Sequence, residues 1–170
     1  ITFGRFTGQI RSGIAREEEE KRLLQNPTLT EALGLNDHIS RSWLLSRAEM
    51  LETPPQILVT NYAMLEHLLL LPRNAGLFAN ADLRFIVLDE VHSYAGAQAI
   101  EVAFLLRKLK TRLGISEGQI RAIGTSASLD QTRRPELVTF AQNLFGEPFP
   151  APDNAVITGK RVLHTALAET

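Results

Sequence analysis

The stretch Phe85-Ile86-Val87-Leu88-Asp89-Glu90-Val91-His92 decides the fold class. Its first half is continuously apolar, which is typical of a parallel strand covered on both faces, and it ends abruptly in two adjacent acids. A helix is predicted from Ala97 to Leu113, because leucines and a valine recur there at helical spacing and Gly114 follows as a stop. The pattern is therefore a buried strand followed by a long helix.

Two further segments repeat this strand-to-helix pattern. The apolar run Ile57–Val59 predicts a short buried strand, and it is followed by a helix that ends before Pro72. The run Ile120–Ile123 is followed by polar hydroxyl residues and then by a helix over Pro135–Phe145. Three such units in series predict an α/β fold with a parallel sheet flanked by helices.

The remaining segments carry shorter patterns. The expected elements are a strand near Ile1–Phe6, a helix over Ala15–Leu24, partly helical structure around Ser40–Leu51, an extended connector at Pro148–Pro152 and a weak strand at Val156–Ile157. The run Glu17–Glu20 is interpreted as a solvated helix face. We assign residues 1–150 to one domain and residues 151–170 to a connector and tail.

Composition excludes several classes of protein. The chain has 170 residues, which is enough for one hydrophobic core and too few for two full domains. It is 44% hydrophobic and 22% charged, so we expect it to fold. It has no cysteine, which excludes disulfides and thiolate metal sites, and no run of about 18 apolar residues, which excludes a membrane span. The net charge of −1 does not by itself indicate nucleic-acid binding.

Polar side chains follow each of the three predicted strands. They are Thr60-Asn61, then Asp89-Glu90 with His92, then Thr125-Ser126-Ala127-Ser128. Because the carboxyl ends of parallel strands meet at one edge of a sheet, we expect these groups to share that edge. Adjacent acids there are costly unless they are wet, paired or hold a cation, and a Mg²⁺ ion would resolve this cost. The plainer alternative is a solvated strand end beside a surface histidine and two turn serines.

Motif order and spacing resemble the first RecA-like domain of superfamily 2 helicases of the DEAD/DEAH-box type. Val87–His92 is similar to the Walker B motif, as a DEVH variant, and Thr125–Ser128 is similar to the Ser-Ala-Thr motif that couples ATP hydrolysis to strand movement. Ile57–Leu65 is similar to the motif that contacts the nucleic-acid backbone, and Arg5–Gly8 to a short glycine-containing loop near the phosphates. The resemblance spans Phe3–Phe149 and looks nearest to large bacterial helicases of DNA repair and phage defence.

This resemblance implies a three-layer RecA-like fold of the P-loop NTPase type and a catalytic role for five residues. Asp89 would hold Mg²⁺ through water, and Glu90 would act as general base or position the attacking water. His92 would link this edge to Ser126 or to a second domain. Ser126 and Ser128 would take part in coupling hydrolysis to movement, where Ser128 stands in place of the family's threonine.

The resemblance also implies a nucleic-acid interface. Thr60, Asn61 and Tyr62 would contact the sugar-phosphate backbone through a hydroxyl, an amide and the amides of a helix N-terminus, and Thr7 and Gly8 would do the same. Such contacts hold single-stranded or duplex DNA or RNA without reading its sequence. A bacterial cytosolic location follows from the same resemblance.

No phosphate-binding loop of the form Gly-x-x-x-x-Gly-Lys-Ser/Thr occurs in the chain, although the family needs one to bind ATP productively. Only Lys160 follows a glycine, and Asn154 and Arg161 occupy the positions that need glycine and a hydroxyl. We therefore expect a partial RecA-like domain that lacks the Walker A strand and loop, with ATP, Mg²⁺ and a second RecA-like domain belonging to a full-length parent. No cofactor is expected to bind this chain tightly, and alone it is expected to be inactive as an ATPase.

Two alternatives remain open from the sequence. The first is a non-catalytic module on a degenerate RecA-like scaffold that binds nucleic acid or protein. The second is a magnesium- or zinc-dependent phosphoesterase that uses Asp89, Glu90 and His92. This second alternative is disfavoured because the other histidines, at positions 38, 67 and 164, lack metal-ligand spacing.

Overall fold

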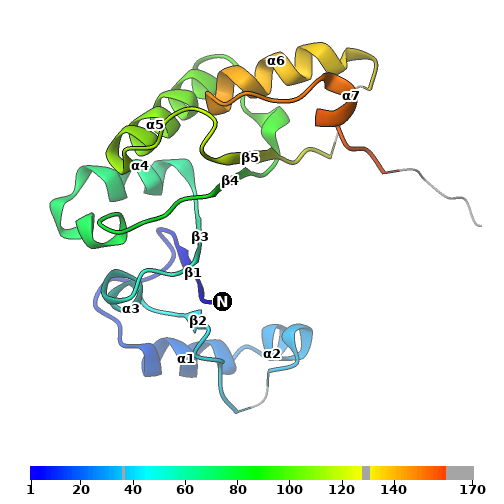
Figure 1. The fold of residues 1–170 in the computed structure, drawn as a ribbon. Coiled ribbons are helices and arrows are strands. Elements are labelled where there is room, and N and C mark those ends of the chain that lie inside the picture. Colours follow the sequence, from blue (N-terminus) through cyan, green and yellow to red (C-terminus); the bar gives the residue numbers. More distant parts are fainter. Residues whose placement is uncertain (36, 128–130, 160–170) are drawn as a thin grey trace, which may run out of the picture. The chain divides into compact units, whose positions relative to one another are not determined.

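The computed structural model describes residues 1–35, 37–127 and 131–159, in which short parallel strands alternate with helices (Figure 1). The strands are β1 (Phe3–Phe6), β2 (Trp43–Leu44), β3 (Ile57–Thr60), β4 (Phe85–Leu88) and β5 (Arg121–Gly124). The α-helices are α1 (Arg16–Leu24), α2 (Pro27–Leu33), α3 (Arg47–Glu52), α4 (Tyr62–Leu70), α5 (Ala97–Leu113), α6 (Arg134–Phe145) and α7 (Pro152–Ala155). Short 3₁₀ helices lie at Pro72–Leu77, Val91–Ser93 and Gln131–Arg133. The predicted α/β class, with parallel strands and flanking helices, is confirmed.

These elements form two compact units, and each is described by itself. Unit 1 contains Ile1–Leu83 and Lys108–Ile115, and unit 2 contains Arg84–Arg107 and the chain from Ser116 onward. The sheet of unit 1 has the order β2-β1-β3, and the sheet of unit 2 pairs β4 with β5. Pairing is parallel as predicted, but the described strands form two sheets rather than one, because no ladder joins β3 to β4.

Strand β1 is the centre of the sheet in unit 1. Phe3 pairs with Trp43 on β2 and with Ile57 on β3. The rings of Phe3 and Trp43 stack with their centroids 5.7 Å apart. Next along β1, a Cβ atom on Gly4 would lie 2.5 Å from Sδ of Met50, so glycine is what allows α3 to pack this closely on the sheet.

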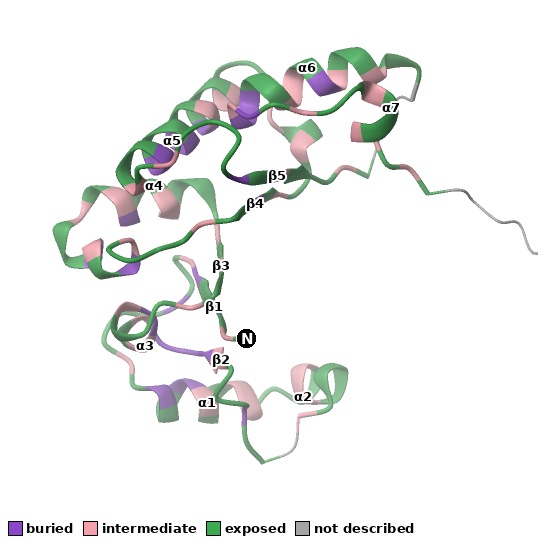
Figure 2. Ribbon diagram, in the orientation of Figure 1, coloured by how far each residue is buried: buried purple, intermediate pink, exposed green. Residues whose placement is uncertain are grey.

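The core of unit 1 is built by residues from β1 and the loop after it, from β2, α3 and α4, and from the segment after α4. Its buried members are Phe6, Ile10, Leu44, Met50, Leu68 and Leu77. Along β1, Gly4 and Phe6 are buried while Phe3 and Arg5 are exposed (Figure 2). This alternation with a period of two places one face of the strand on the core.

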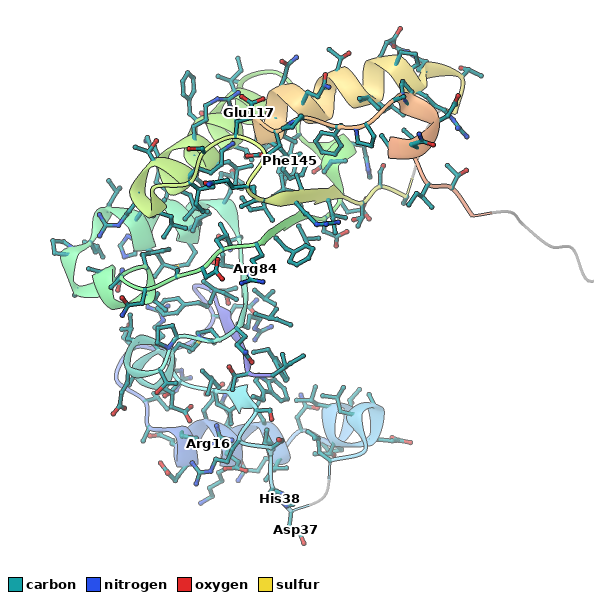
Figure 3. The ribbon with its side chains drawn as sticks, viewed as in Figure 1. Arg16, Asp37, His38, Arg84, Glu117 and Phe145 are labelled. Carbon is teal, nitrogen blue, oxygen red and sulfur yellow. The ribbon has the colours of Figure 1, made fainter. Side chains whose placement is uncertain are left out.

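Arg16, at the start of α1 and labelled in Figure 3, is a buried charged residue in unit 1. Its guanidinium donates hydrogen bonds to three backbone carbonyl oxygens between α2 and α3 and to Oε1 of Glu49 at 2.9 Å. Burial opposes ionisation of Glu49, but the hydrogen bonds from Arg16 and from the backbone amides of Ser46 and Leu45 hold the pKa of this carboxyl below its usual range. The buried charge is thereby paired, as its burial requires.

Unit 2 is built around the β4-β5 pair, in which Leu88 lies opposite Gly124. Helices α5 and α6 run along one side of this pair (Figure 1). The buried apolar residues of unit 2 are Ile86, Val102, Leu105, Leu106, Ile120, Val138, Leu144 and Phe145, of which Phe145 is labelled in Figure 3. Arg107 on α5 donates a hydrogen bond of 3.0 Å to the backbone oxygen of Asn143 on α6, which ties the two helices together.

The prediction that β3 and β4 are fully buried strands is wrong. Val59 on β3 is 51% exposed and Val87 on β4 is 58% exposed. Figure 2 draws parts of both strands in the colour of exposed residues. In each unit the described helices and loops pack against one face of the sheet, so alternate side chains on the other face stay uncovered.

The predicted helical structure around Ser40–Leu51 is only partly correct. Trp43–Leu44 pairs with β1 as strand β2, and helix α3 begins after Ser46. Ser46 forms a capping box with Glu49, since its hydroxyl accepts from the Glu49 amide at 3.2 Å and the Glu49 carboxylate accepts from the Ser46 amide at 3.1 Å. This cap fixes where the helix starts.

Three smaller expectations also need correction. Glu19 does not lie on a solvated face, because it is buried and paired with Arg22, whose pKa this hydrogen bond raises. The expected connector at Pro148–Pro152 runs into helix α7, which has proline in its first turn. Val156–Ile157 forms no strand, because neither residue pairs with another strand of the described chain.

The other predicted helices are confirmed. Helix α5 spans Ala97–Leu113, and Gly114 follows it with a φ of 66°. Helix α6 ends before Gly146, which adopts the left-handed conformation that glycine takes at helix ends. Among residues 1–35, 37–127 and 131–159, no helix has both the length and the apolar character needed to span a membrane.

Candidate functional site

The loop after β4 is fastened to the end of β5 by its backbone. The amide of Thr125 donates to the carbonyl oxygen of Leu88 at 2.9 Å, and the amide of Val91 donates to the carbonyl oxygen of Thr125, also at 2.9 Å. Because Leu88 pairs with Gly124, the residues that follow the two strands, Asp89 and Thr125, lie next to each other. The parallel register therefore brings two of the predicted polar groups together.

Side chains strengthen this junction. The Thr125 hydroxyl donates a hydrogen bond to Oδ1 of Asp89. The amide of Glu90 points at the same two groups, 3.1 Å from Oδ1 of Asp89 and 3.3 Å from Oγ1 of Thr125. Glu90 has a φ of 52°, which makes it the one non-glycine residue with positive φ among the described residues. This left-handed conformation is costly for a residue with a Cβ atom, and it turns the chain sharply after Asp89.

His92 links Glu90 to Ser126. Its Nδ1 atom lies 2.8 Å from the hydroxyl oxygen of Ser126 and 3.1 Å from Oε2 of Glu90. A carboxylate only accepts hydrogen bonds, so a proton on Nδ1 fits both partners. A Ser-His-acid catalytic triad needs its serine and its carboxylate on opposite ring nitrogens, and here both lie at one nitrogen. The arrangement therefore orients Glu90 and does not activate Ser126 as a nucleophile.

The carboxylates at this junction fit a water-mediated magnesium ion. The Asp89 and Glu90 residues are exposed, so neither carries a large burial cost. Contacts within the described chain use Oδ1 of Asp89, which leaves Oδ2 for water or a cation. Among residues 1–35, 37–127 and 131–159, no group of three or more His, Asp or Glu side chains could hold a metal ion. Mg²⁺ commonly keeps several waters and uses one or two carboxylates together with phosphate oxygens, so this donor set suits it.

Four of the five predicted catalytic residues are brought together in unit 2: Asp89, Glu90, His92 and Ser126. Ser128 lies outside the described residues. Thr125 was not among the predicted site residues, although it opens the motif Thr125–Ser128. The available signal was its position directly after β5, where parallel pairing places it beside the residue that follows β4.

The predicted nucleic-acid residues lie in unit 1, where β3 leads into α4. The Thr60 hydroxyl donates to the carbonyl oxygen of Phe6 at 2.7 Å, which ties the end of β3 to the end of β1. Asn61 caps α4, since its side-chain oxygen accepts from the Met64 amide at 2.8 Å. Tyr62 begins the helix and is 38% exposed.

The loop after β1 contributes Thr7 and Gly8 to this group. The hydroxyl oxygen of Thr7 is buried and has no hydrogen-bond partner among the described residues, while its carbonyl oxygen accepts from Arg47 at 3.0 Å. Gly8 is exposed, and a Cβ atom built on it would meet nothing within 4 Å. Gly8 therefore offers open backbone, whereas Thr7 offers no exposed hydroxyl.

A family model of the DEAD/DEAH box helicase matches residues 21–135. The chain belongs to this family. The match includes the loop after β4, the Thr125–Ser126 junction and the start of α4, which are the parts of the chain with the geometry described above.

Two individual proteins also resemble the chain. The Druantia protein DruE of Escherichia coli (strain UMEA 4076-1) is 38% identical over 128 residues, which cover 69% of this chain and 7% of DruE. The crystal structure of the DUF1998 helicase MrfA matches 86% of this chain and 22% of its own, with 23% sequence identity and a TM-score of 0.46. The chain thus spans a small part of the length of either protein.

Proposed function

We propose that the junction between the ends of β4 and β5 is the hydrolysis and coupling part of an ATP-dependent nucleic-acid helicase or translocase. The observation that carries the proposal is the hydrogen-bonded group of Asp89, Glu90, His92, Thr125 and Ser126. It places two carboxylates beside a histidine and two hydroxyls at adjacent carboxyl ends of parallel strands, where ligands bind in α/β proteins. Membership of a helicase family supports the same reading.

Asp89 and Glu90 have separate roles in this proposal. When bound, magnesium-ATP supplies the phosphoryl group that water attacks and a cation that offsets its charge. Asp89 would hold the cation through water with Oδ2, the carboxylate oxygen that Thr125 leaves open. Glu90 orients the attacking water and accepts its proton. His92 orients the Glu90 carboxylate, since its Nδ1 atom lies 3.1 Å from Oε2 of Glu90.

His92 and Ser126 carry the coupling role. Their hydrogen bond of 2.8 Å joins the loop that holds Glu90 to the loop that follows β5. A change in the position of Glu90 on hydrolysis would therefore be transmitted to Ser126 through the side chain of His92. The proposed outcome is movement of a second RecA-like domain and of the bound nucleic acid.

The start of α4 and the loop after β1 form the proposed nucleic-acid interface. The backbone amides of the first turn of α4, next to the exposed Tyr62, favour phosphate oxygens. Gly8 permits close approach of a sugar-phosphate chain because no side chain stands there. Thr60 and Asn61 act by shaping this surface, since their side chains are bonded to the Phe6 carbonyl and the Met64 amide. Such an interface binds the backbone without reading base sequence.

This chain alone is proposed to have negligible ATPase activity. It contains no Gly-x-x-x-x-Gly-Lys-Ser/Thr run. A phosphate-binding loop and a second RecA-like domain are the parts that the proposal assigns to the parent protein. Residues 1–170 should therefore show no measurable turnover, whereas the parent protein should hydrolyse ATP.

The test measures steady-state ATP hydrolysis by the parent protein with and without single-stranded DNA or RNA. We expect Glu90→Gln to lower nucleic-acid-stimulated turnover by about a hundredfold or more, because the water loses its base. Glu101→Gln is the matched control, since Glu101 is an exposed acid on α5. Unchanged turnover in Glu90→Gln would contradict the proposal. Nucleic-acid binding without any turnover in the wild-type parent would support the non-catalytic alternative.

A further inference from the structure

We propose that Thr125 is a positioning residue that holds Asp89 and Glu90 in their working arrangement, an inference that rests on the proposed ATPase function. Thr125 differs from the rest of the group because it approaches both acids from the neighbouring strand. Its role is distinct from that of Ser126, whose hydroxyl lies against His92. It acts through the two carboxylates and not on the substrate.

The Thr125 hydroxyl is used in both directions. It donates its proton to Oδ1 of Asp89 and accepts the amide proton of Glu90 at 3.3 Å. One hydroxyl therefore fixes the side chain of the first acid and the backbone of the second. No other side chain of the described chain forms hydrogen bonds with both residues.

Backbone hydrogen bonds fix the position of Thr125 and so restrict where its hydroxyl can lie. The Thr125 amide donates to the carbonyl oxygen of Leu88 at the end of β4, and the Thr125 carbonyl oxygen accepts from the amide of Val91 in the loop that follows, at 2.9 Å each. The preceding Gly124 lies against Val91, because a Cβ atom there would come within 3.0 Å of Cγ1 of Val91. Threonine is also stiff about its first side-chain torsion, so the hydroxyl loses little freedom when it binds. The bridge that the Thr125 hydroxyl forms between Asp89 and Glu90 is therefore held by a rigid backbone.

The bridge explains why Glu90 keeps its unfavourable conformation. A φ of 52° is rare for a residue with a side chain and persists only where its surroundings impose it. The two acceptors that face the Glu90 amide, from Asp89 and Thr125, impose it here. Removal of the hydroxyl leaves one acceptor, and relaxation of φ would swing the Glu90 carboxylate away from His92. Hydrolysis would then slow although both acids are still present.

The experiment uses the parent protein and measures kcat, KM for ATP, the Mg²⁺ concentration at half-maximal rate and the melting temperature. Thr125→Val keeps the shape of the side chain and removes the hydroxyl. We expect it to lower kcat tenfold or more, to leave KM within twofold and to raise the Mg²⁺ requirement. Thr125→Ser restores the hydroxyl and should recover at least a third of the wild-type kcat. Thr139→Val is the control, since its exposed hydroxyl bonds only to the backbone of α6.

The outcomes separate this inference from the proposed function. A kcat in Thr125→Val within twofold of wild type, together with loss of turnover in Glu90→Gln, would overturn the role of Thr125 and leave the function standing. Retained turnover in Glu90→Gln would overturn the function itself. A valine variant that fails to fold is replaced by Thr125→Ala, for which the same loss of kcat and the same rescue by serine are expected. A fall in kcat that serine does not rescue would contradict the bridge.

Discussion

The Nδ1 atom of His92 lies 2.8 Å from the hydroxyl oxygen of Ser126, which joins the loops after β4 and β5 by side chains as well as by backbone. The same nitrogen lies 3.1 Å from Oε2 of Glu90. A single imidazole therefore contacts both the proposed water-activating acid and the proposed coupling hydroxyl. Because both partners lie at the same ring nitrogen, the geometry fits a coupling role for His92 and does not fit a Ser-His-acid catalytic triad.

The Ser126→Ala substitution should separate hydrolysis from movement. Without the hydroxyl, His92 can still orient Glu90, so we expect ATP turnover of the parent protein to stay within about threefold of wild type. The rate of strand separation or translocation should fall by about tenfold or more, because the hydrogen bond between His92 and Ser126 is lost. Parallel ATPase and unwinding assays measure this, with the exposed Ser93→Ala as control. Equal losses in both assays would argue against a coupling role.

The Gly124→Ala substitution should disturb the junction by packing. A Cβ atom at this position would lie 3.0 Å from Cγ1 and 3.4 Å from Cγ2 of Val91. We expect a loss of about 1–3 kcal/mol in the free energy of unfolding, which is usual for overpacking. The double variant Gly124→Ala with Val91→Ala should recover part of this loss, as measured by urea denaturation. A double variant as unstable as the sum of the two single ones would show that the contact is not the cause.

The acid Glu49 predicts how the stability of unit 1 depends on pH. Its pKa is held below the ordinary value of 4.5, so its contribution to stability is complete above that value and is lost as the pH falls through the lower pKa of the folded state. Unfolding can be followed by the fluorescence of Trp43, the single tryptophan, whose carbonyl oxygen is bonded to Arg16. We expect the wild-type chain to lose stability as the pH falls below about 4.5.

The Glu49→Gln variant supplies the matched comparison. At neutral pH it should be less stable by about 2 kcal/mol, because the buried Arg16 loses its charged partner. Its stability should also change less between neutral and acidic pH than that of the wild type. Identical pH profiles for the two proteins would show that Glu49 does not contribute in this way.

The open backbone at Gly8 leads to a prediction about nucleic-acid binding. Gly8→Ala should leave the melting temperature unchanged, since nothing lies within 4 Å of the added atom. It should weaken binding of single-stranded DNA or RNA to the parent protein several-fold, because the methyl group would block close approach of the backbone. Gly159→Ala, which also adds its Cβ atom into open space, is the control. Unchanged affinity in a titration at fixed salt would place the nucleic acid elsewhere.

Much of the fold could be predicted where a long pattern repeats. Helix α5 has its predicted bounds because its apolar spacing continues over many turns and a glycine ends it. The strand Trp43–Leu44 could not be predicted, because two residues carry no periodicity and the pairing with β1 is a tertiary contact. Coverage of the strands was predicted wrongly because an apolar run does not show how many faces are packed. Val87 is apolar and 58% exposed.

Some features of the candidate site can likewise be read from the sequence, while others depend on tertiary contacts. The sequence places Asp89 and Glu90 directly after an apolar strand, and His92 was added to them by the resemblance to the Walker B motif. The bridge from Thr125 could not be predicted, because it depends on the register that places Leu88 opposite Gly124. The left-handed conformation of Glu90 could not be predicted either, since one of the two acceptors that face its amide, the Thr125 hydroxyl, comes from a distant part of the chain.

The most direct measurement of the central claim is a single-turnover experiment on the parent protein with prebound radiolabelled ATP. It separates the chemical step from binding and release, so it reports on the step in which Glu90 is proposed to act. We predict that Glu90→Gln binds ATP with nearly the wild-type affinity and forms labelled phosphate at least a hundredfold more slowly than wild type. Formation of phosphate at the wild-type rate would contradict the assignment of the β4-β5 junction as the site of hydrolysis.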